Sequence, residues 1–536
     1  MKINSWYVSS FLISFIVAIP IVTVSSSFLE DTSNYFEILK NTFLYEYIFN
    51  SLFLLIGVLI LTLIIGVGCA YLVSFYEFIG AKFFKWGLIL SFAVPAYIYA
   101  YSLTAFFENY GTLFSILKSL FGDGNYNKFI PKLDGMLGAM ISISFSLFGY
   151  VYVLTRASFH HQSQNLIELG QNLGFTRQKS FFSIILPSAR PAIVAGLALV
   201  AMETLSDFGS VSFFGISTLT TGIYDSWISF DDLAFANQLS FFLLLFIFAL
   251  FYIENISRKR AQYHTPLRGG IKKKEKIQLK GIYSYGAFLI CAAVFSLSFL
   301  FPVFQMLYWS LIFPKNFIDL DIIQLFLNTM LLVFLTSAVL LFFSFLSNYG
   351  NRVTRSKLLK VLSTFSITGY AIPAVILAVA FITFIAWFDN TIIKYFDLVS
   401  IKKIFIGSVL GLVIVYFVRF YSLSFNGIKS GYERINRSID ESSYLLGYSK
   451  LKTFFGIHVP YLKNSIFLIG ILISIEVIKE LPITLILRPF NFETFATTAY
   501  VFASQDLLEA AAAPSLFLIL IASCFILITS KYILRD

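Results

Sequence analysis

The stretch that decides the fold reads Ile167-Glu168-Leu169-Gly170-Gln171-Asn172-Leu173-Gly174 and continues through a basic segment to Ile184-Ile185-Leu186-Pro187. It is polar and partly basic, yet it lies between two long apolar segments. Its skeleton is a Glu, a Gly six residues later, an Ile at sixteen and a Pro at nineteen, and the same skeleton returns as Glu441, Gly447, Ile457 and Pro460. Four positions at one repeated spacing indicate a duplicated element. A polar segment between membrane spans must serve a soluble partner or a pore.

The composition of the chain indicates a membrane protein. Of its 536 residues, 58% are hydrophobic and 13% are charged, and the mean hydropathy is +0.81. Soluble domains carry about a quarter charged residues, so lipid is the expected solvent. The three cysteines, Cys69, Cys291 and Cys524, each lie in an apolar run. This placement gives no basis for a disulfide framework, a redox pair or a cysteine-ligated metal.

Twelve apolar segments are long enough to cross a bilayer, because a helical span needs about 20 apolar residues. Six are expected in the first half, near 7–27, 50–74, 86–107, 137–155, 191–210 and 239–256. Six are expected in the second half, near 282–312, 327–347, 358–387, 404–425, 465–486 and 513–531. Backbone polar groups in hydrocarbon must be bonded internally, so helices are expected rather than open strands. A signal peptide competes for the first segment, but the apolar run is long for one.

Residues 257–281 separate the two sets of spans and hold nine Lys or Arg and one Glu. The net charge of +10 could suggest nucleic acid, but this stretch lacks a folded platform, and we expect a solvated linker. By the positive-inside rule the linker is cytoplasmic. Most other basic loops agree, although Lys118 and Lys402 are among the exceptions on the outer side. Both termini are therefore predicted to be cytoplasmic.

The two halves are repeats of one another. Asn50, Ser51 and Pro95 match Asn328, Thr329 and Pro373 at an offset of 278, while Glu168, Gly174, Pro187 and Glu203 match Glu441, Gly447, Pro460 and Glu476 at an offset of 273. An even number of spans keeps both copies in one orientation, so we expect parallel repeats that enclose a central pathway. The predicted domains are 1–256 and 282–536, with the polar loops near 156–190 and 426–463. The first loop is expected to carry Glu168 on a short helix that ends near Gly174.

Two pairs of carboxylates lie in the spans that follow the duplicated loops. Glu203 and Asp207 are four residues apart, as are Glu476 and Glu480, so we expect each pair on one face of one helix. Carboxylates within a membrane usually face a bundle interior or a water-filled cavity. These four side chains are the candidates for the translocation pathway.

Three roles stay open for the four carboxylates. They could line a path for a cation, bind the cargo directly, or pair with basic neighbours such as Lys479 or Arg488 to hold helices together. The four histidines, His160, His161, His264 and His458, all lie in predicted cytoplasmic segments. No metal site is therefore firmly assigned. A metal ion that passed between the spans would meet carboxylate and hydroxyl oxygens rather than imidazoles.

The duplicated loop resembles the coupling ("EAA") loop of bacterial ABC-importer permeases, which docks on a cytoplasmic ATPase. The sequence departs from the family pattern after each glutamate, with Leu169-Gly170 and Ser442-Ser443 in place of two alanines, and Val459 replaces a usual leucine. A finer resemblance to the ferric-iron branch of these permeases is carried by the runs Met202–Gly215, Thr220–Tyr224, Lys479–Pro482, Leu487–Phe490 and Ala510–Ala512.

The resemblance implies an all-α type I importer permease of two fused six-helix repeats in a bacterial inner membrane. It implies that Fe(III) arrives on a periplasmic binding protein and that two copies of an ABC ATPase drive alternating access. The coupling residues carried over from the family are Glu168, Gly174, Pro187, Glu441, Gly447 and Pro460. The chain has no Gly-Lys dipeptide and therefore no P-loop, so ATP and Mg are expected on the partner subunits. No cofactor, nucleic-acid partner or catalytic residue is expected on this chain.

Three rival interpretations remain. The same machinery could carry another solute, such as thiamine, a polyamine or sulfate, although an anion path would be expected to offer basic groups. A secondary transporter could use the buried carboxylates for protons, but it does not predict the duplicated loop. A membrane enzyme or scaffold would need a catalytic cluster or a large soluble domain, and neither stands out.

Overall fold

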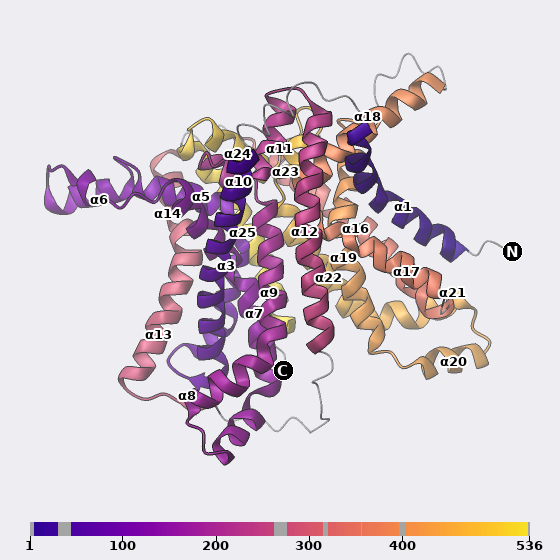
Figure 1. Ribbon diagram of the computed structural model, residues 1–536, viewed down its shortest axis with the longest axis horizontal. Helices are drawn as coiled ribbons and strands as arrows, with labels where there is room; N and C mark the ends of the chain where they lie inside the picture. The colour runs from indigo at the N-terminus through magenta and orange to yellow at the C-terminus, as the bar shows by residue number, and fades with distance from the viewer. Residues whose placement is uncertain are drawn as a thin grey trace.

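The computed structural model describes residues 5–29, 44–261, 276–314, 320–354, 356–395 and 404–533 (Figure 1). These parts are mostly helical, and two short strands, β1 (Tyr76–Glu77) and β2 (Ile277–Gln278), pair in parallel. The end of the predicted linker is therefore attached to the first half. Next to β2, the Nζ atom of Lys276 donates a hydrogen bond of 2.7 Å to the carbonyl of Val73. Linker residues 262–275, with His264, lie outside the described part.

The first half is a succession of long helices with shorter turns between them. Its helices are α1 (Ser5–Ser26), η1 (Ser27–Leu29), α3 (Leu44–Phe75), α4 (Ala81–Gly87), η2 (Leu88–Ala93), α5 (Ala96–Phe107), α6 (Thr112–Phe121), η3 (Tyr126–Lys128), α7 (Gly135–Asn172), α8 (Arg177–Ser180), η4 (Phe181–Ile185), α9 (Leu186–Ser206), α10 (Gly209–Phe213), α11 (Leu219–Ile228) and α12 (Leu233–Ala261).

The second half follows the same order. Its helices are α13 (Ile282–Phe295), η6 (Ser296–Leu300), α14 (Phe301–Ile312), α16 (Ile322–Thr354), α17 (Lys357–Ser366), η7 (Ile367–Ala371), α18 (Ala374–Tyr395), α19 (Val409–Glu433), α20 (Arg437–Leu445), α21 (Lys450–Thr453), η8 (Phe454–His458), α22 (Val459–Lys479), α23 (Pro482–Leu487), α24 (Phe495–Ser504) and α25 (Leu508–Ile533). Single π-helical turns, η4 and η8, precede α9 and α22 in both halves.

Eleven of the described helices are long and apolar enough to cross a membrane, and a bent pair of helices, 81–93 and 96–121, supplies a twelfth candidate. Six of these candidates precede the linker and six follow it. The all-α membrane fold predicted from hydropathy is therefore confirmed. Figure 1 shows α8 and α20 at the same lower end of the molecule, as parallel repeats require.

The third span of each half is not the continuous helix that was predicted. In the first half, the two helices meet at an angle of 91°; in the second, η7 and α18 are separated by Ile372 and Pro373. Proline has no N–H and disfavours helical geometry in the residue before it. Accordingly Val94 and Ile372 are extended, with ψ values of 106° and 124°. The predictions of unbroken helices over 86–107 and 358–387 were wrong.

The span predicted over 191–210 is α9, which begins and ends earlier, and that over 465–486 is α22, displaced in the same way. In both halves, a threonine caps the second short helix after this span. Thr218 caps α11 and Thr494 caps α24, each in a reciprocal capping box. Asn50 and Asn328 donate hydrogen bonds of 3.0 and 2.9 Å to the backbone just before these caps. The duplication seen in the sequence therefore extends to the hydrogen bonds that fasten individual loops.

The first helix of each half packs against the opposite half. Helix α1 lies against α17 and α18, and α14 lies against α5 as well as α25. The largest apolar core accordingly contains buried residues of both halves, among them Val17, Tyr99, Val375 and Tyr416. At another contact of this kind, Cys69 on α3 and Cys291 on α13 are buried in one apolar cluster.

Candidate functional site

A cavity of about 130 Å³ lies between the two halves, and all four predicted pathway carboxylates line it. Glu203 and Asp207 come from the first half, and Glu476 and Glu480 come from the second. The rest of the lining mixes hydroxyl, backbone and basic groups; its polar members are Tyr97, Ser146, Tyr150, Ser206, Arg419 and Lys479. The structure thus brings together side chains that are 273 residues apart in the chain.

Asp207 and Glu480 do not share a helix face with their partners, contrary to the prediction from spacing. Helix α9 ends at Ser206 and α22 at Lys479, and both acids are extended, with ψ of 126° and 124°. Each carboxylate turns to the helix that follows and accepts two of its backbone N–H groups, at 3.0 and 3.2 Å for Asp207 and at 3.0 and 3.1 Å for Glu480. Unsatisfied N–H groups at a helix start favour an acceptor there, so these two acids cap α10 and α23.

Glu203 is paired across the interface between the halves. Its carboxylate lies 3.3 Å from Nη2 of Arg419 on α19 and accepts a hydrogen bond of 3.1 Å from the hydroxyl of Tyr370. The other guanidinium nitrogen, Nη1, donates to the backbone carbonyls of Tyr370 and Ile372, at 3.2 and 2.8 Å. The guanidinium therefore holds the backbone next to Pro373 and the carboxylate of the opposite half at once.

Glu476 is paired within its own helix. Its carboxylate lies 3.3 Å from Nζ of Lys479, one turn along α22. Glu480 instead bonds to the hydroxyl of Tyr416 at 3.3 Å and to that of Thr484 at 3.0 Å. Of the pairings left open for these acids, that of Glu476 with Lys479 is present. Arg488 pairs with Glu493 rather than with either predicted partner.

Sequence reasoning missed Arg419, although a signal was present. Arg419 lies inside the apolar segment predicted as a span over 404–425, and a charged residue within a span is a functional candidate by default. The cavity thus holds four carboxylates against two basic side chains. Among the described residues, no group of three or more His, Cys, Asp or Glu side chains is arranged to hold a metal ion.

The two duplicated polar segments end in the same backbone geometry. Gly174 and Gly447 have φ of 75° and 81°, in the left-handed region that favours glycine. Across each turn, an N–H bonds to the carbonyl five residues earlier, at 2.9 Å in the first copy and 3.1 Å in the second, as in a Schellman motif. Pro187 and Pro460 then lie in the first turns of α9 and α22, where a missing N–H costs least.

The two segments differ in how their helix begins. In the second copy, the short helix α20 carries Glu441 with its side chain exposed. In the first copy, the backbone of Glu168 belongs to the long helix α7, so the short helix predicted there was wrong. The side chains of Glu168, His160 and His161 lie outside the described part. In the second copy, Arg352 donates hydrogen bonds to the carbonyls of Tyr432, Ile435 and Asn436, which lie where α19 ends and α20 begins.

Apolar side chains project from the second polar segment. Leu445, Leu446, Leu451 and Phe455 are between 65% and 89% exposed, and the last three line a groove beside Tyr448 and Lys452. Nζ of Lys452 lies 4.4 Å from the centre of the Tyr448 ring, and Lys179 lies equally close to Phe175 in the first copy. Contiguous exposed apolar groups mark interaction surfaces.

Comparison with known proteins gives the context for this geometry. Residues 62–262 match the family described as "binding-protein-dependent transport system inner membrane component". Along 92% of both lengths, the chain is 22% identical to an Fe(3+)-transport system permease protein of Haemophilus influenzae. It is also 22% identical to a ferric transport system permease protein of Actinobacillus pleuropneumoniae, over 91% of this chain and 72% of the relative.

A sulfate transport system permease protein of Salmonella typhimurium is 27% identical over 155 residues, which are 28% of this chain and 51% of that relative. The family description and the apolar helices together place the chain in the inner membrane as a multi-pass protein. Residues 62–262 are therefore similar to the binding-protein-dependent transport system inner membrane components, and most of the chain is similar to transport permeases.

Proposed function

We propose that the chain is the membrane permease of an importer that moves ferric iron, delivered by a periplasmic binding protein, across a bacterial inner membrane. The observation that carries this proposal is the similarity to a ferric permease along 92% of both chains. A relationship that includes both halves and the linker is more informative about cargo than a match to one segment.

The chemistry of the cavity supports the same cargo. Its acidic side chains outnumber its basic ones by four to two, and phenol and hydroxyl groups supply further oxygen ligands. Hard oxygen donors suit a hard cation. The carboxylates are spread around the cavity and mostly bonded to protein groups, an arrangement that suits passage of a cation better than tight retention.

The energy is proposed to come from two copies of a cytoplasmic ABC ATPase that bind ATP and Mg. We assign their docking to the segments around Glu168 and Glu441, with the exposed leucines near Gly447 as apolar contacts. This assignment places both termini and the linker in the cytoplasm, and it divides the chain into repeats of residues 1–256 and 282–536. Closure of the ATPases would rock the halves about the cavity.

Sulfate is the second candidate, because sulfate permeases match 155 residues of the chain. Arg419 and Lys479 could serve an anion only if they left their carboxylate partners, which lie within 3.3 Å. Breaking such pairs in a buried site is costly. Because of this requirement, sulfate is a weaker candidate for the cargo than iron.

The test is uptake into proteoliposomes that contain the chain with its ATPase subunits, supplied with radioactive ferric ion on a ferric-binding protein or with radioactive sulfate on a sulfate-binding protein. ATP-dependent uptake of iron alone is expected. The variant Glu168→Ala plus Glu441→Ala is the control for coupling, and it is expected to lose both ATPase capture and uptake. Uptake of sulfate without iron would overturn the cargo assignment, and uptake that needs no ATPase would overturn the importer assignment.

A further inference from the structure

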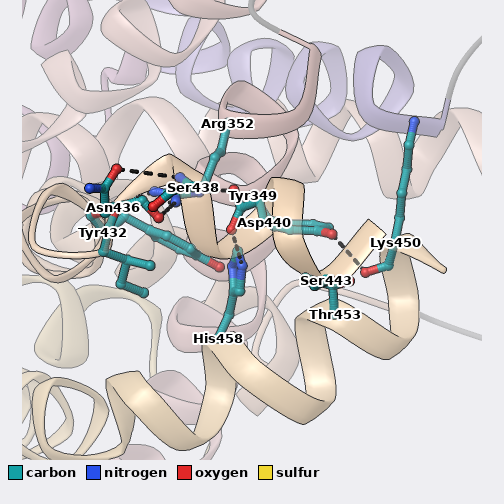
Figure 2. A network of polar contacts seen from close by, with 11 residues as sticks. Tyr349, Arg352, Tyr432, Asn436, Ser438, Asp440, Ser443, Lys450, Thr453 and His458 are labelled. Atoms are coloured by element: carbon teal, nitrogen blue, oxygen red, sulfur yellow. Dashed lines mark hydrogen bonds and ion pairs between the residues drawn. The ribbon is translucent and has the colours of Figure 1, made fainter. Parts of the chain in front are cut away.

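A buried ionic network joins the second polar segment to two membrane spans (Figure 2). Asp440 on α20 accepts a hydrogen bond of 2.6 Å from Nε of Arg352, which lies near the end of α16. The second oxygen of Asp440 lies 2.9 Å from Nε2 of His458, in the π-helical turn that leads into α22. One carboxylate therefore connects three helical elements.

The network is largely shielded from solvent. The side chains of Arg352, Asp440 and His458 are 9%, 13% and 0% exposed, whereas the adjacent Glu441 is exposed. Neighbours on a helix point about 100° apart, which follows from 3.6 residues per turn. Asp440 thus faces the spans, and Glu441 faces the surface proposed for the ATPase.

Further contacts fix the same elements. The hydroxyl of Tyr349 on α16 donates to the carbonyl of Lys450 at 2.6 Å, and the hydroxyls of Ser443 and Thr453 lie 2.5 Å apart. The rings of Tyr349 and Tyr432 each lie 5.3 Å from the ring of His458. Helix α20 is therefore tied to α16 and α22 by directional bonds, with aromatic packing around them.

The first half cannot form this network. At the repeat offsets of 278 and 273, Arg352, Asp440 and His458 correspond to Ser74, Ile167 and Ile185. Aromatic packing around these positions is common to both halves, since the ring of Phe181 lies 4.3 Å from Tyr71 and the ring of Phe454 lies 5.0 Å from Tyr349. Apolar contacts are non-directional and allow packed elements to slide by small amounts.

We infer that Asp440 is a positioning residue for transport, because it makes α20 move as one body with α16 and α22. This inference rests on the proposed function of the segment as an ATPase-docking element. A guanidinium and an imidazole stabilise a buried carboxylate only while the distances and angles of their hydrogen bonds to it are kept. Motion imposed on α20 must therefore carry the two spans along, and the residues at the corresponding positions of the first half, Ser74, Ile167 and Ile185, cannot form the same ion pair. The two coupling segments are consequently not equivalent.

The test uses Asp440→Asn in the full chain, co-expressed with its ATPase subunits. Asparagine keeps the shape of the side chain but removes the charge that opposes Arg352. We expect ATPase capture and ATP hydrolysis to persist, while iron taken up per ATP hydrolysed falls by about fivefold or more, the lower end of the range for coupling between sites. Glu441→Ala is expected to behave oppositely and to lose capture.

Two further variants separate positioning from general stability. Asp389→Asn removes another buried carboxylate of the second half, which accepts three backbone N–H groups near the far end of α18 (Figure 1); it is expected to keep the wild-type ratio of iron to ATP. His458→Gln retains an N–H donor toward Asp440 and is expected to remain coupled. Should Asp440→Asn fail to assemble, Arg352→Lys tests the same bond and should lower the ratio.

The outcomes are distinguishable. A wild-type ratio in both Asp440→Asn and Arg352→Lys, or an equal fall in Asp389→Asn, would overturn the positioning role. A wild-type chain that captures no ATPase would instead overturn the proposed function on which the inference rests. A wild-type chain that captures ATPase but moves sulfate would change the cargo only, and the same ratio would then be measured with sulfate.

Discussion

The ion pair between Glu203 and Arg419 offers the sharpest test of how the cavity is held together. Arg419→Gln would remove the charge that faces Glu203 and at least one of the two hydrogen bonds to the carbonyls of Tyr370 and Ile372. Breaking a buried pair by removing one partner costs about 3–5 kcal/mol. Because Glu203 is 23% exposed to the cavity, water can solvate its carboxylate in part, and we expect the lower end of that range.

The reciprocal change, Glu203→Gln, should be milder. Arg419 would keep both backbone carbonyls, and glutamine could still accept a hydrogen bond from the guanidinium. In the double variant Glu203→Gln plus Arg419→Gln, no uncompensated charge remains. Interaction energies between contacting residues are about 0.5–3 kcal/mol, and the double variant is expected to be more stable than the sum of the single effects by an amount in this range.

The assay is thermal unfolding of the purified chain in detergent, for the wild type and the three variants. The quantity measured is the fraction of protein that stays monodisperse after heating. The same preparations would be reconstituted to record transport, because the pair joins α9 of one half to α19 of the other. Additive effects of the two single changes, within about 0.5 kcal/mol, would refute the claim that the pair couples the halves.

Three other changes have defined expectations in the same assays. Gly447→Ala should be destabilised by about 1–2 kcal/mol, because alanine is strained at a φ of 81°, and it should also weaken ATPase capture; normal capture would separate the turn from docking. Asn328→Ala should lose about 1 kcal/mol with its hydrogen bond to the loop before α24, and an unchanged melting temperature would contradict this. Glu480→Ala leaves two buried N–H groups of α23 without their acceptor and should cost more than Glu476→Ala, since an unsatisfied buried donor costs about 1–3 kcal/mol; equal effects would argue against the capping role.

Hydropathy and the duplicated spacing were sufficient to predict the twelve candidate spans and the all-α membrane fold. They suffice because hydrocarbon leaves the backbone few alternatives to a helix. The convergence of Glu203, Asp207, Glu476 and Glu480 on one cavity also followed from the matching offsets of the repeats. These predictions depend on patterns that extend over many residues, so small local departures do not disturb them.

The local ends of helices were beyond the same reasoning. A spacing of four residues suggested one helix face for Glu476 and Glu480, but the carboxylate of Glu480 caps the following helix, and Pro482 at the start of α23 was the overlooked sign of the break. His458 was assigned to a cytoplasmic segment, but the burial of its ring against Asp440 was not predicted. Its partner is 18 residues away, and only the turn at Gly447 brings the two together.

The exchanged packing of the first helices has a mechanical consequence. Since α1 lies against α17 and α18, while α14 lies against α5 as well as α25, each sequence repeat shares buried apolar surface with the other through its first helix. Two fragments made by cutting the chain between the repeats are therefore expected to stay associated, because their separation would expose this apolar surface to solvent.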